Sequence, residues 1–160
     1  MSSRRNSLSD NHIYYMEQAL SLAKKNQGLT GENPSVGCVL VKKDQIISSG
    51  VTSINGRPHA EVNAIKNSKE KVNGSTLYVT LEPCNHYGKT PPCTNLIKKK
   101  EIKKVYYGVN DIDPITAKSA KKFFRKNKIN FFKGILSVKL NSFYKSYFYI
   151  KKNKLPYVVG

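Results

Sequence analysis

The chain has 160 residues, of which 39% are hydrophobic, and this favours one globular domain over a chain that is disordered as a whole. Its net charge of +18, from 28 basic and 10 acidic residues, attracts phosphate-bearing partners. No apolar run is long enough to span a bilayer, and no signal-peptide core is evident, so we expect a cytoplasmic protein without membrane contact.

The first part of the chain combines a polar start with a helical pattern. We expect residues 1–8 to be a flexible N-terminal extension of a domain that spans 9–160. A helix should begin with Ser9 or Asp10 as its cap and end before Gly28. Its buried face should consist of the apolar residues with helical spacing, which are Ile13, Met16, Ala19, Leu20 and Ala23.

Strand-like and helix-like runs alternate along the rest of the chain. Clusters of β-branched and aromatic residues predict strands at 36–42, 45–53, 76–81, 104–109 and 129–132. Capping and breaking residues predict helices at 59–68, 93–100, 116–127 and 137–151. The first two strands should form an antiparallel hairpin, and strands joined through helices should be parallel. The pattern predicts an α/β protein with a mixed five-stranded sheet and helices on both faces.

Three metal-ligand side chains and one carboxylate follow a pattern typical of catalytic zinc sites. His59 follows a proline and precedes Glu61 by two residues, and Cys84 and Cys93 also follow prolines. One imidazole and two thiolates leave the fourth position of zinc open, as in catalytic sites, and we predict one zinc ion per chain. Because residues two apart do not share a helix face, His59 must lie at the helix start. The combination matches the signature of zinc deaminases.

The predicted chemistry is hydrolytic removal of an amino group. Zinc lowers the pKa of its bound water to near neutrality, and Glu61 can take a proton from that water and pass it to a departing amine. The third cysteine, Cys38, lies in a strand-like run and is expected to pack in the core. His12 is expected to be a surface or core residue without a ligand role.

The long loop between the two cysteines distinguishes among deaminases. Eight residues separate Cys84 from Cys93, whereas the usual nucleoside and tRNA deaminase signature has two between its cysteines. The chain resembles the deaminase domain of bacterial riboflavin-biosynthesis proteins over about Tyr14 to Val158. The segments that carry this resemblance are 33–39, 58–65, 80–94 and, at the junction toward that family's reductase domain, 155–158.

The resemblance implies a three-layer cytidine-deaminase-like fold and a defined reaction. That reaction is hydrolysis of 2,5-diamino-6-(5-phosphoribosylamino)pyrimidin-4(3H)-one to 5-amino-6-(5-phosphoribosylamino)uracil and ammonia, in riboflavin biosynthesis. By resemblance, Glu61 shuttles protons beside zinc held by His59, Cys84 and Cys93. The positions that match the family's substrate pocket are Asn33, His86, Lys89 and Asp111. The implied partners are the small anionic pyrimidine ribosyl phosphate, further copies of the chain in a homo-oligomer, and a separate reductase acting on the product.

The chain departs from the family pattern at three places. Thr52 stands where the family often has a histidine, seven residues before the zinc histidine. The family's Asp-Pro-Asn-Pro loop is present here as 111–114, with Ile and Asp at its second and third positions. The chain stops at Gly160 without a dinucleotide-binding fingerprint, so we expect a stand-alone deaminase, with truncation before a reductase as the alternative.

Two other functions remain open at this point. A nucleoside, tRNA or other nucleic-acid base deaminase is favoured by the positive charge. It is disfavoured by the long cysteine loop and by the absence of an aromatic-basic tract, so nucleic acid is not the expected partner. A non-enzymatic zinc-binding module is disfavoured by Glu61, because a structural zinc site does not require a carboxylate there.

Overall fold

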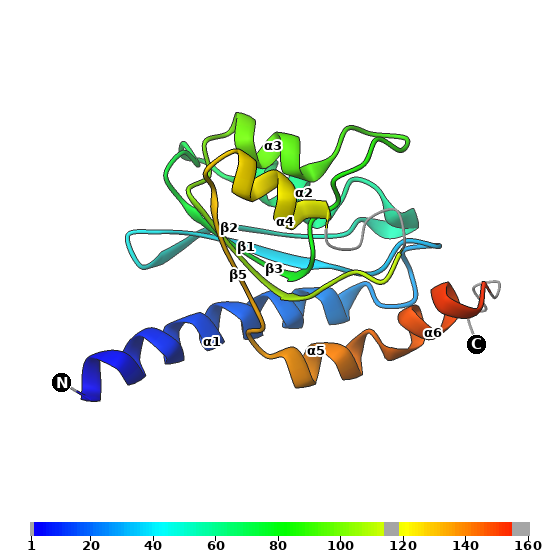
Figure 1. Cartoon of the computed structure of the whole chain (residues 1–160), viewed down its shortest axis with the longest axis horizontal. Coiled ribbons are helices and arrows are strands. Elements are labelled where there is room, and N and C mark those ends of the chain that lie inside the picture. Colours follow the sequence, from blue (N-terminus) through cyan, green and yellow to red (C-terminus); the bar gives the residue numbers. More distant parts are fainter. Residues whose placement is uncertain (1, 114–118, 155–160) are drawn as a thin grey trace.

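The computed structural model describes residues 2–113 and 119–154, which form a sheet between two layers of helices (Figure 1). The strands are β1 Gly37–Lys42, β2 Gln45–Val51, β3 Thr76–Leu81, β4 Lys104–Val109 and β5 Asn130–Lys133. The helices are α1 Ser2–Lys25, α2 Ala60–Asn67, α3 Cys93–Lys99, α4 Ser119–Lys126, α5 Ser137–Phe143 and α6 Lys145–Asn153, with a 3-10 turn at Ile54–Gly56. The predicted α/β class, with a mixed five-stranded sheet and helices on both faces, is confirmed.

The strand order in the sheet is β2-β1-β3-β4-β5. β1 is antiparallel to both β2 and β3, while β3, β4 and β5 are parallel to one another. The sequence predicted the hairpin, but the second antiparallel pair arises because β3 lies beside β1 and not beside β2. Leu81 of β3 pairs with Val109 of β4, so the loops that follow these two strands leave the same edge of the sheet. Ligand sites of open α/β sheets form at such an edge.

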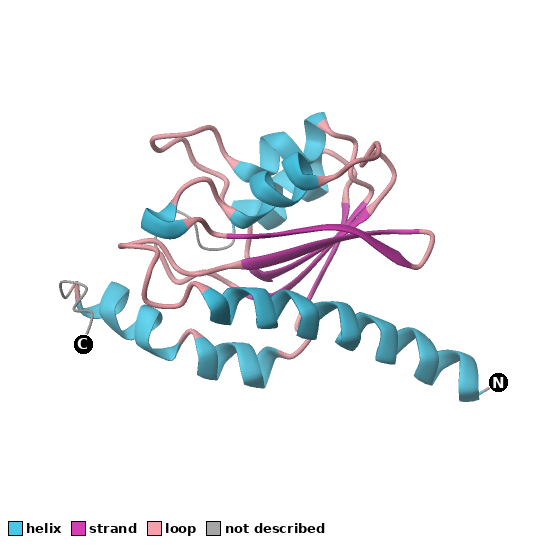
Figure 2. Ribbon diagram, turned by 180° about the vertical axis from the view of Figure 1, so that it is seen from behind, coloured by secondary structure: helices cyan, strands magenta, loops and turns pink. Residues whose placement is uncertain are grey.

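The two faces of the sheet carry different helices. α1, α5 and α6 cover one face, and α2, α3 and α4 cover the other, as both views of the ribbon show (Figures 1 and 2). α1 packs on β1 and β3, and α2 packs on β2 and β1. Cys38 in β1 is fully buried between the layers, which confirms the predicted core role of this cysteine.

The N-terminal helix is longer than the sequence predicted. α1 begins at Ser2, so the expected cap at Ser9 or Asp10 lies within the helix and is wrong. No proline or glycine interrupts the first residues, so the helix continues through them. Four of the five residues predicted for its buried face are buried, but Ile13 is 42% exposed. His12 is half-buried, and its Nδ1 lies 2.6 Å from the hydroxyl of Tyr78.

The last predicted helix is two helices, α5 and α6, which meet at Tyr144. Tyr144 is buried, and its hydroxyl donates to the carbonyl oxygen of Ser35 at 2.9 Å and lies 2.6 Å from the Oγ1 of Thr80. A buried hydroxyl needs such partners, and here they fix the junction between the two helices against the sheet. The start expected for the preceding helix and the family-like segment 155–158 lie outside the described residues.

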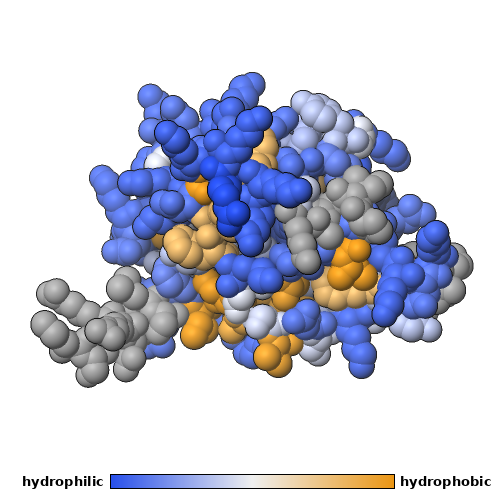
Figure 3. Space-filling view, in the orientation of Figure 1, coloured by the Kyte–Doolittle hydropathy of each residue, from blue (hydrophilic) through white to orange (hydrophobic). Residues whose placement is uncertain are grey.

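Hydrophilic side chains cover most of the face in Figure 3, in keeping with the high net charge. Apolar side chains gather mainly in the lower part of that view, in the layer of α1 and α5. In the described part of the chain, the search for a helix with the length and apolar character of a membrane span finds none.

Candidate active site

The predicted zinc ligands and the predicted proton carrier converge at the N-termini of α2 and α3. His59 is the N-cap residue of α2, with an extended backbone at φ −68° and ψ 163°, as predicted from its spacing to Glu61. Glu61 lies in the first turn of α2 and is 4% exposed. The extended cap turns the imidazole toward the same space as the carboxylate, which a regular helix would not allow.

The two cysteines approach His59 from the loop that follows β3. Pro92 is the N-cap residue of α3, and Cys93 is the first residue of that helix. The Nδ1 of His59 lies 3.5 Å from the Sγ of Cys93 and 3.7 Å from the Sγ of Cys84. The backbone N–H of Cys93 donates to the Sγ of Cys84 at 3.2 Å, which favours a thiolate at the N-terminus of a helix.

Close packing holds α2 in place against β2. Gly50 faces α2 so closely that a Cβ at this position would overlap the carbonyl oxygen of Ala60 and the backbone nitrogen of Ala64. The Nδ2 of Asn63 donates to the carbonyl oxygen of Val51 at 2.7 Å and to the Oγ of Ser53 at 2.9 Å. These contacts join the helix that carries the metal-ligand histidine and the carboxylate to the edge of the sheet.

The electrostatics of the site suit metal binding and proton transfer. Burial, together with the nearby Cys84 sulfur, raises the pKa of Glu61 to about 6. Hydrogen bonds from the Cys93 thiol, from His59 and from the backbone lower the pKa of Cys84 to about 4. The hydrogen bond from the Cys93 thiol to the Cys84 sulfur raises the pKa of Cys93, and burial of the thiol raises it further. The site therefore holds a thiolate at Cys84 and a carboxyl group that can change its protonation near neutral pH.

The donor set fits a catalytic zinc site. The ligand atoms of His59, Cys84 and Cys93 all lie within 4.8 Å of one another. One imidazole nitrogen and two sulfurs are three of the four ligands of a tetrahedral zinc ion, and the fourth direction can face a cavity. The carboxylate Oε2 of Glu61 accepts a hydrogen bond from the Cys93 thiol at 3.6 Å, so it lies beside the ligands.

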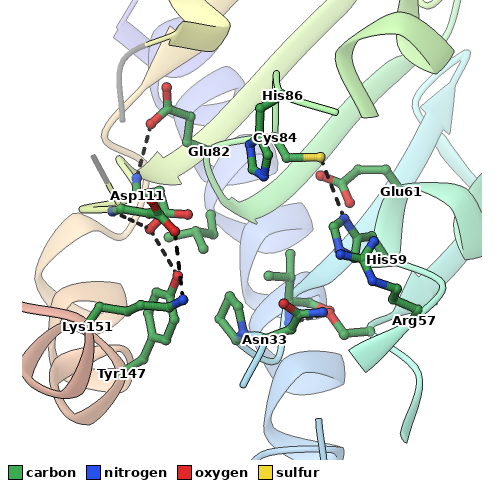
Figure 4. A pocket seen from close by; sticks show the side chains of 15 residues that line it. Asn33, Arg57, His59, Glu61, Glu82, Cys84, His86, Asp111, Tyr147 and Lys151 are labelled. Atoms are coloured by element: carbon green, nitrogen blue, oxygen red, sulfur yellow. Dashed lines mark hydrogen bonds and ion pairs between the residues drawn. The ribbon is translucent and has the colours of Figure 1, made fainter. Parts of the chain in front are cut away.

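A cavity of about 100 Å³ lies over the predicted zinc ligands His59 and Cys84 (Figure 4). Three of the four predicted substrate residues line it, namely Asn33, His86 and Asp111. The Nδ2 of Asn33 donates to the carbonyl oxygen of Gly56 at 3.0 Å, which orients the side chain at the cavity wall. Lys89 is exposed and does not line this cavity, so its substrate role stays a prediction.

The wall opposite the predicted zinc ligands contains residues that the sequence analysis did not single out. The hydroxyl of Tyr147 donates to the Oδ1 of Asp111 at 3.1 Å, and the backbone N–H of Asp111 donates to the Oε2 of Glu82 at 3.1 Å. The Nζ of Lys151 lies 3.7 Å from the Oδ2 of Asp113. The spacing of Tyr147 and Lys151 by one helical turn was the only signal that the sequence offered for them.

Thr52 and Arg57 also line the cavity. The Oγ1 of Thr52 accepts a hydrogen bond from the backbone N–H of Val36 at 2.9 Å and is buried, so this position supports β1. The guanidinium of Arg57 donates to the Oγ1 of Thr90 at 2.7 Å and so contacts the loop that carries both cysteines. No sequence pattern marked Arg57, because its contact with Thr90 depends on how that loop folds.

Comparisons with known proteins agree with this geometry. Residues 9–109 match the family model for the cytidine and deoxycytidylate deaminase zinc-binding region. The chain is 40% identical to the diaminohydroxyphosphoribosylamino-pyrimidine deaminase of Buchnera aphidicola, in an alignment that covers 91% of this chain and 99% of that protein. It is also 40% identical to the riboflavin biosynthesis protein RibD of Actinobacillus pleuropneumoniae, over 91% of this chain and 39% of that protein. The chain thus spans about two fifths of the length of this relative.

A solved structure gives the same result for the fold. The crystal structure of a Thermotoga maritima diaminohydroxyphosphoribosylaminopyrimidine deaminase/5-amino-6-(5-phosphoribosylamino)uracil reductase superimposes with a TM-score of 0.85 at 37% identity. The superposition covers 91% of this chain and 42% of that chain. The chain therefore belongs to the cytidine and deoxycytidylate deaminase family, and within it to the diaminohydroxyphosphoribosylamino-pyrimidine deaminases.

Proposed function

We propose that the chain removes the 2-amino group of 2,5-diamino-6-(5-phosphoribosylamino)pyrimidin-4(3H)-one by hydrolysis. The products would be 5-amino-6-(5-phosphoribosylamino)uracil and ammonia, and the reaction would serve riboflavin biosynthesis. The observation that carries the proposal is the convergence of His59, Cys84 and Cys93 within 4.8 Å, with Glu61 beside them, below an open cavity. The name and the near-complete coverage of the Buchnera relative support this substrate.

We propose zinc as the cofactor, held by His59, Cys84 and Cys93. When bound in a site of this kind, zinc supplies Lewis acidity that makes a water molecule nucleophilic near neutral pH. The low pKa of the Cys84 thiol supports this assignment, because thiolate is the form that binds the metal. The family's zinc-binding region includes both His59 and Cys84 and supports the same choice of metal.

Glu61 would carry the proton in this reaction. With a pKa raised to about 6 by burial, its carboxylate accepts a proton from water near neutral pH and can return it to a leaving group. The water oxygen forms a bond to ring carbon 2, the bond from that carbon to the amino nitrogen breaks, and Glu61 delivers the proton to that nitrogen. One water molecule is consumed and one ammonia is released.

The proposal also covers the substrate contacts, the location, the oligomeric state and a partner enzyme. Asn33, His86 and Asp111 would contact the substrate from the cavity wall, and Lys89 would act from the neighbouring loop. We further propose that the protein works in the cytoplasm, that it forms a homo-oligomer, and that a separate reductase uses its product. Light scattering tests the oligomeric state, and a coupled assay with a separately purified reductase tests the last step.

The direct test is to incubate zinc-loaded protein with the diaminopyrimidine ribosyl phosphate and to follow ammonia. We expect release that stops with a chelator and resumes with added zinc. Parallel reactions with cytidine, a tRNA and single-stranded DNA test the remaining deaminase functions. Ammonia release from one of these, with none from the pyrimidine phosphate, would replace the proposed function.

A further inference from the structure

The cavity has two walls with different chemistry. Figure 4 shows that the first wall, which includes the zinc ligands, contains His59, Glu61, Cys84 and Arg57. It shows that the second wall contains Asp111, Tyr147 and Lys151, beside Glu82. The second wall is built from the loop after β4 and from α6, both beyond the matched family region at 9–109.

Charge is distributed unequally between these walls. Among the described lining residues, the lysine and arginine side chains are those of Arg57 and Lys151. Arg57 lies next to His59, and one of its nitrogens donates a hydrogen bond to Thr90. The second wall has the carboxyl groups of Asp111 and Asp113, and of the described lining residues Lys151 is the cation that pairs with Asp113.

The next step rests on the proposed function. The carbon that loses its amino group belongs to the pyrimidine ring, so the ring must lie at the zinc ligands and Glu61. The phosphate is attached to the far end of the ribose and must therefore lie away from the metal. A phosphate dianion beside the carboxyl groups of this wall needs a cation, and Lys151 is the cation that the described residues place there.

The contacts of α6 allow Lys151 to take this role. Tyr147, one helical turn before Lys151, is bonded to buried Asp111 and fixes the helix at the cavity. The pair of Lys151 and Asp113 is long, at 3.7 Å, and its side chains are 36% and 23% exposed. Partly solvated ion pairs contribute little to stability, so the ammonium can turn from the aspartate to a phosphate at small cost.

We infer that Lys151 is a specificity-determining residue of this deaminase, which binds the substrate's phosphate and neutralises the acidic second wall of the cavity. Without Lys151, the phosphate loses a charge-assisted contact and the acidic wall loses a positive charge. The effect should appear in substrate binding, because the reacting ring lies at the other wall. Lys151→Arg should preserve binding, since a guanidinium also pairs with phosphate.

The test compares Lys151→Ala with Lys152→Ala, which removes the same charge from the next, exposed position of α6. Steady-state kinetics are measured with the ribosyl phosphate and with its dephosphorylated counterpart. For Lys151→Ala we expect KM for the phosphate substrate to rise about ten- to a hundredfold, with little change in kcat. KM for the dephosphorylated substrate should not change, and Lys152→Ala should resemble the unmodified protein. The inference would be overturned if Lys151→Ala and Lys152→Ala raised KM equally. It would also be overturned if Lys151→Ala raised KM equally for the phosphate substrate and the dephosphorylated substrate.

Calorimetric titration with ribose 5-phosphate separates this inference from the proposed function, because it requires no turnover. Binding to the zinc-loaded unmodified protein and to Lys152→Ala, but not to Lys151→Ala, supports the phosphate subsite even if no ammonia is released. Failure of the unmodified protein to bind ribose 5-phosphate, or equal binding by all three, refutes the subsite. Absence of ammonia release alone refutes only the proposed reaction.

Discussion

The carboxylate of Glu61 lies 3.6 Å from the sulfur of Cys93, although 31 residues separate them in the chain. Glu61 comes from the first turn of α2 and Cys93 from the first residue of α3, so two helix N-termini meet at one point. The carboxylate is therefore beside the predicted metal ligands without being one of them. This arrangement separates the role of binding the metal from the role of moving the proton.

We predict that Glu61→Gln lowers kcat by about a hundred- to ten-thousandfold, because the amide cannot accept and return a proton. Zinc content, measured by mass spectrometry of the purified protein, should stay near one ion per chain. A variant that keeps its turnover would contradict the proposed proton transfer. A variant that loses its zinc would show that Glu61 supports the metal.

Removal of either sulfur ligand should abolish zinc binding. Cys84→Ser and Cys93→Ser are each expected to purify with little zinc and no activity, since two ligands hold the ion far more weakly than three. Cys38→Ala is the matched control, because Cys38 is fully buried and is not one of the three grouped ligand residues. The control should keep its zinc while losing some stability. Zinc loss in the control and retention in Cys84→Ser would contradict the assignment.

The pKa of Asp111 predicts a specific dependence of stability on pH. Burial raises this pKa in the folded protein, although hydrogen bonds from Asp113 and Tyr147 oppose the shift. The folded protein therefore binds the Asp111 proton more tightly than the unfolded chain does, and this stabilises the fold. The stabilisation is fully present below the pKa of an unfolded aspartate, about 3.9. It is lost as the pH rises through the higher pKa of Asp111 in the folded protein. The Asp111→Asn side chain keeps an oxygen that can accept the hydrogen bond from Tyr147, but it cannot ionise.

Urea unfolding of the unmodified protein and of Asp111→Asn should be compared between about pH 3 and pH 7, a range that includes the pKa of an unfolded aspartate. We expect the free energy of unfolding of the unmodified protein, relative to the variant, to fall as pH rises through this range. If the free energy of unfolding of the unmodified protein, relative to that of Asp111→Asn, increased with pH, the folded protein would favour the ionised carboxylate of Asp111. That result would contradict the raised pKa.

Gly50→Ala should displace α2 from β2. Its Cβ would overlap backbone atoms of Ala60 and Ala64, which cannot move as a flexible side chain would. We expect a loss of about 1–3 kcal/mol in the free energy of unfolding and weaker zinc binding, because His59 begins the same helix. Gly88→Ala is the control for stability, since the nearest atoms to its added methyl group lie at 3.6 Å and 4.0 Å. Equal stability of the two variants would refute close packing at Gly50.

Tyr144→Phe tests the attachment of α5 and α6 to the sheet. The change removes a buried hydroxyl that bonds Ser35 and Thr80, and it should cost about 1–3 kcal/mol of unfolding free energy. Tyr149→Phe is the matched control, because Tyr149 is 61% exposed, and it should change stability by less than about 0.5 kcal/mol. Thermal and urea unfolding of both variants measure the difference, and equal effects would contradict a structural role of the buried hydroxyl.

The amino-acid sequence was sufficient to predict the helix start at His59, because local chain rules determine it. Residues two apart cannot share a helix face, so the spacing of His59 and Glu61 required a helix start, and the structure has one there. The alternation of strands and helices likewise predicted the layered sheet, since amphipathic elements must bury their apolar sides. The N-terminal limit of α1 was missed because no helix-breaking residue marks it.

The second wall of the cavity was decided only by the tertiary structure. Tyr147 and Lys151 are far from His59 in the chain, and they reach the cavity because β3 pairs with β1 and β4, which places the loop after β4 opposite the zinc ligands. Strand pairing depends on packing between distant segments, and periodicity within one segment does not specify it. The residues that would bind metal and carry the proton follow from local sequence, whereas those that would select the substrate follow from how the sheet assembles.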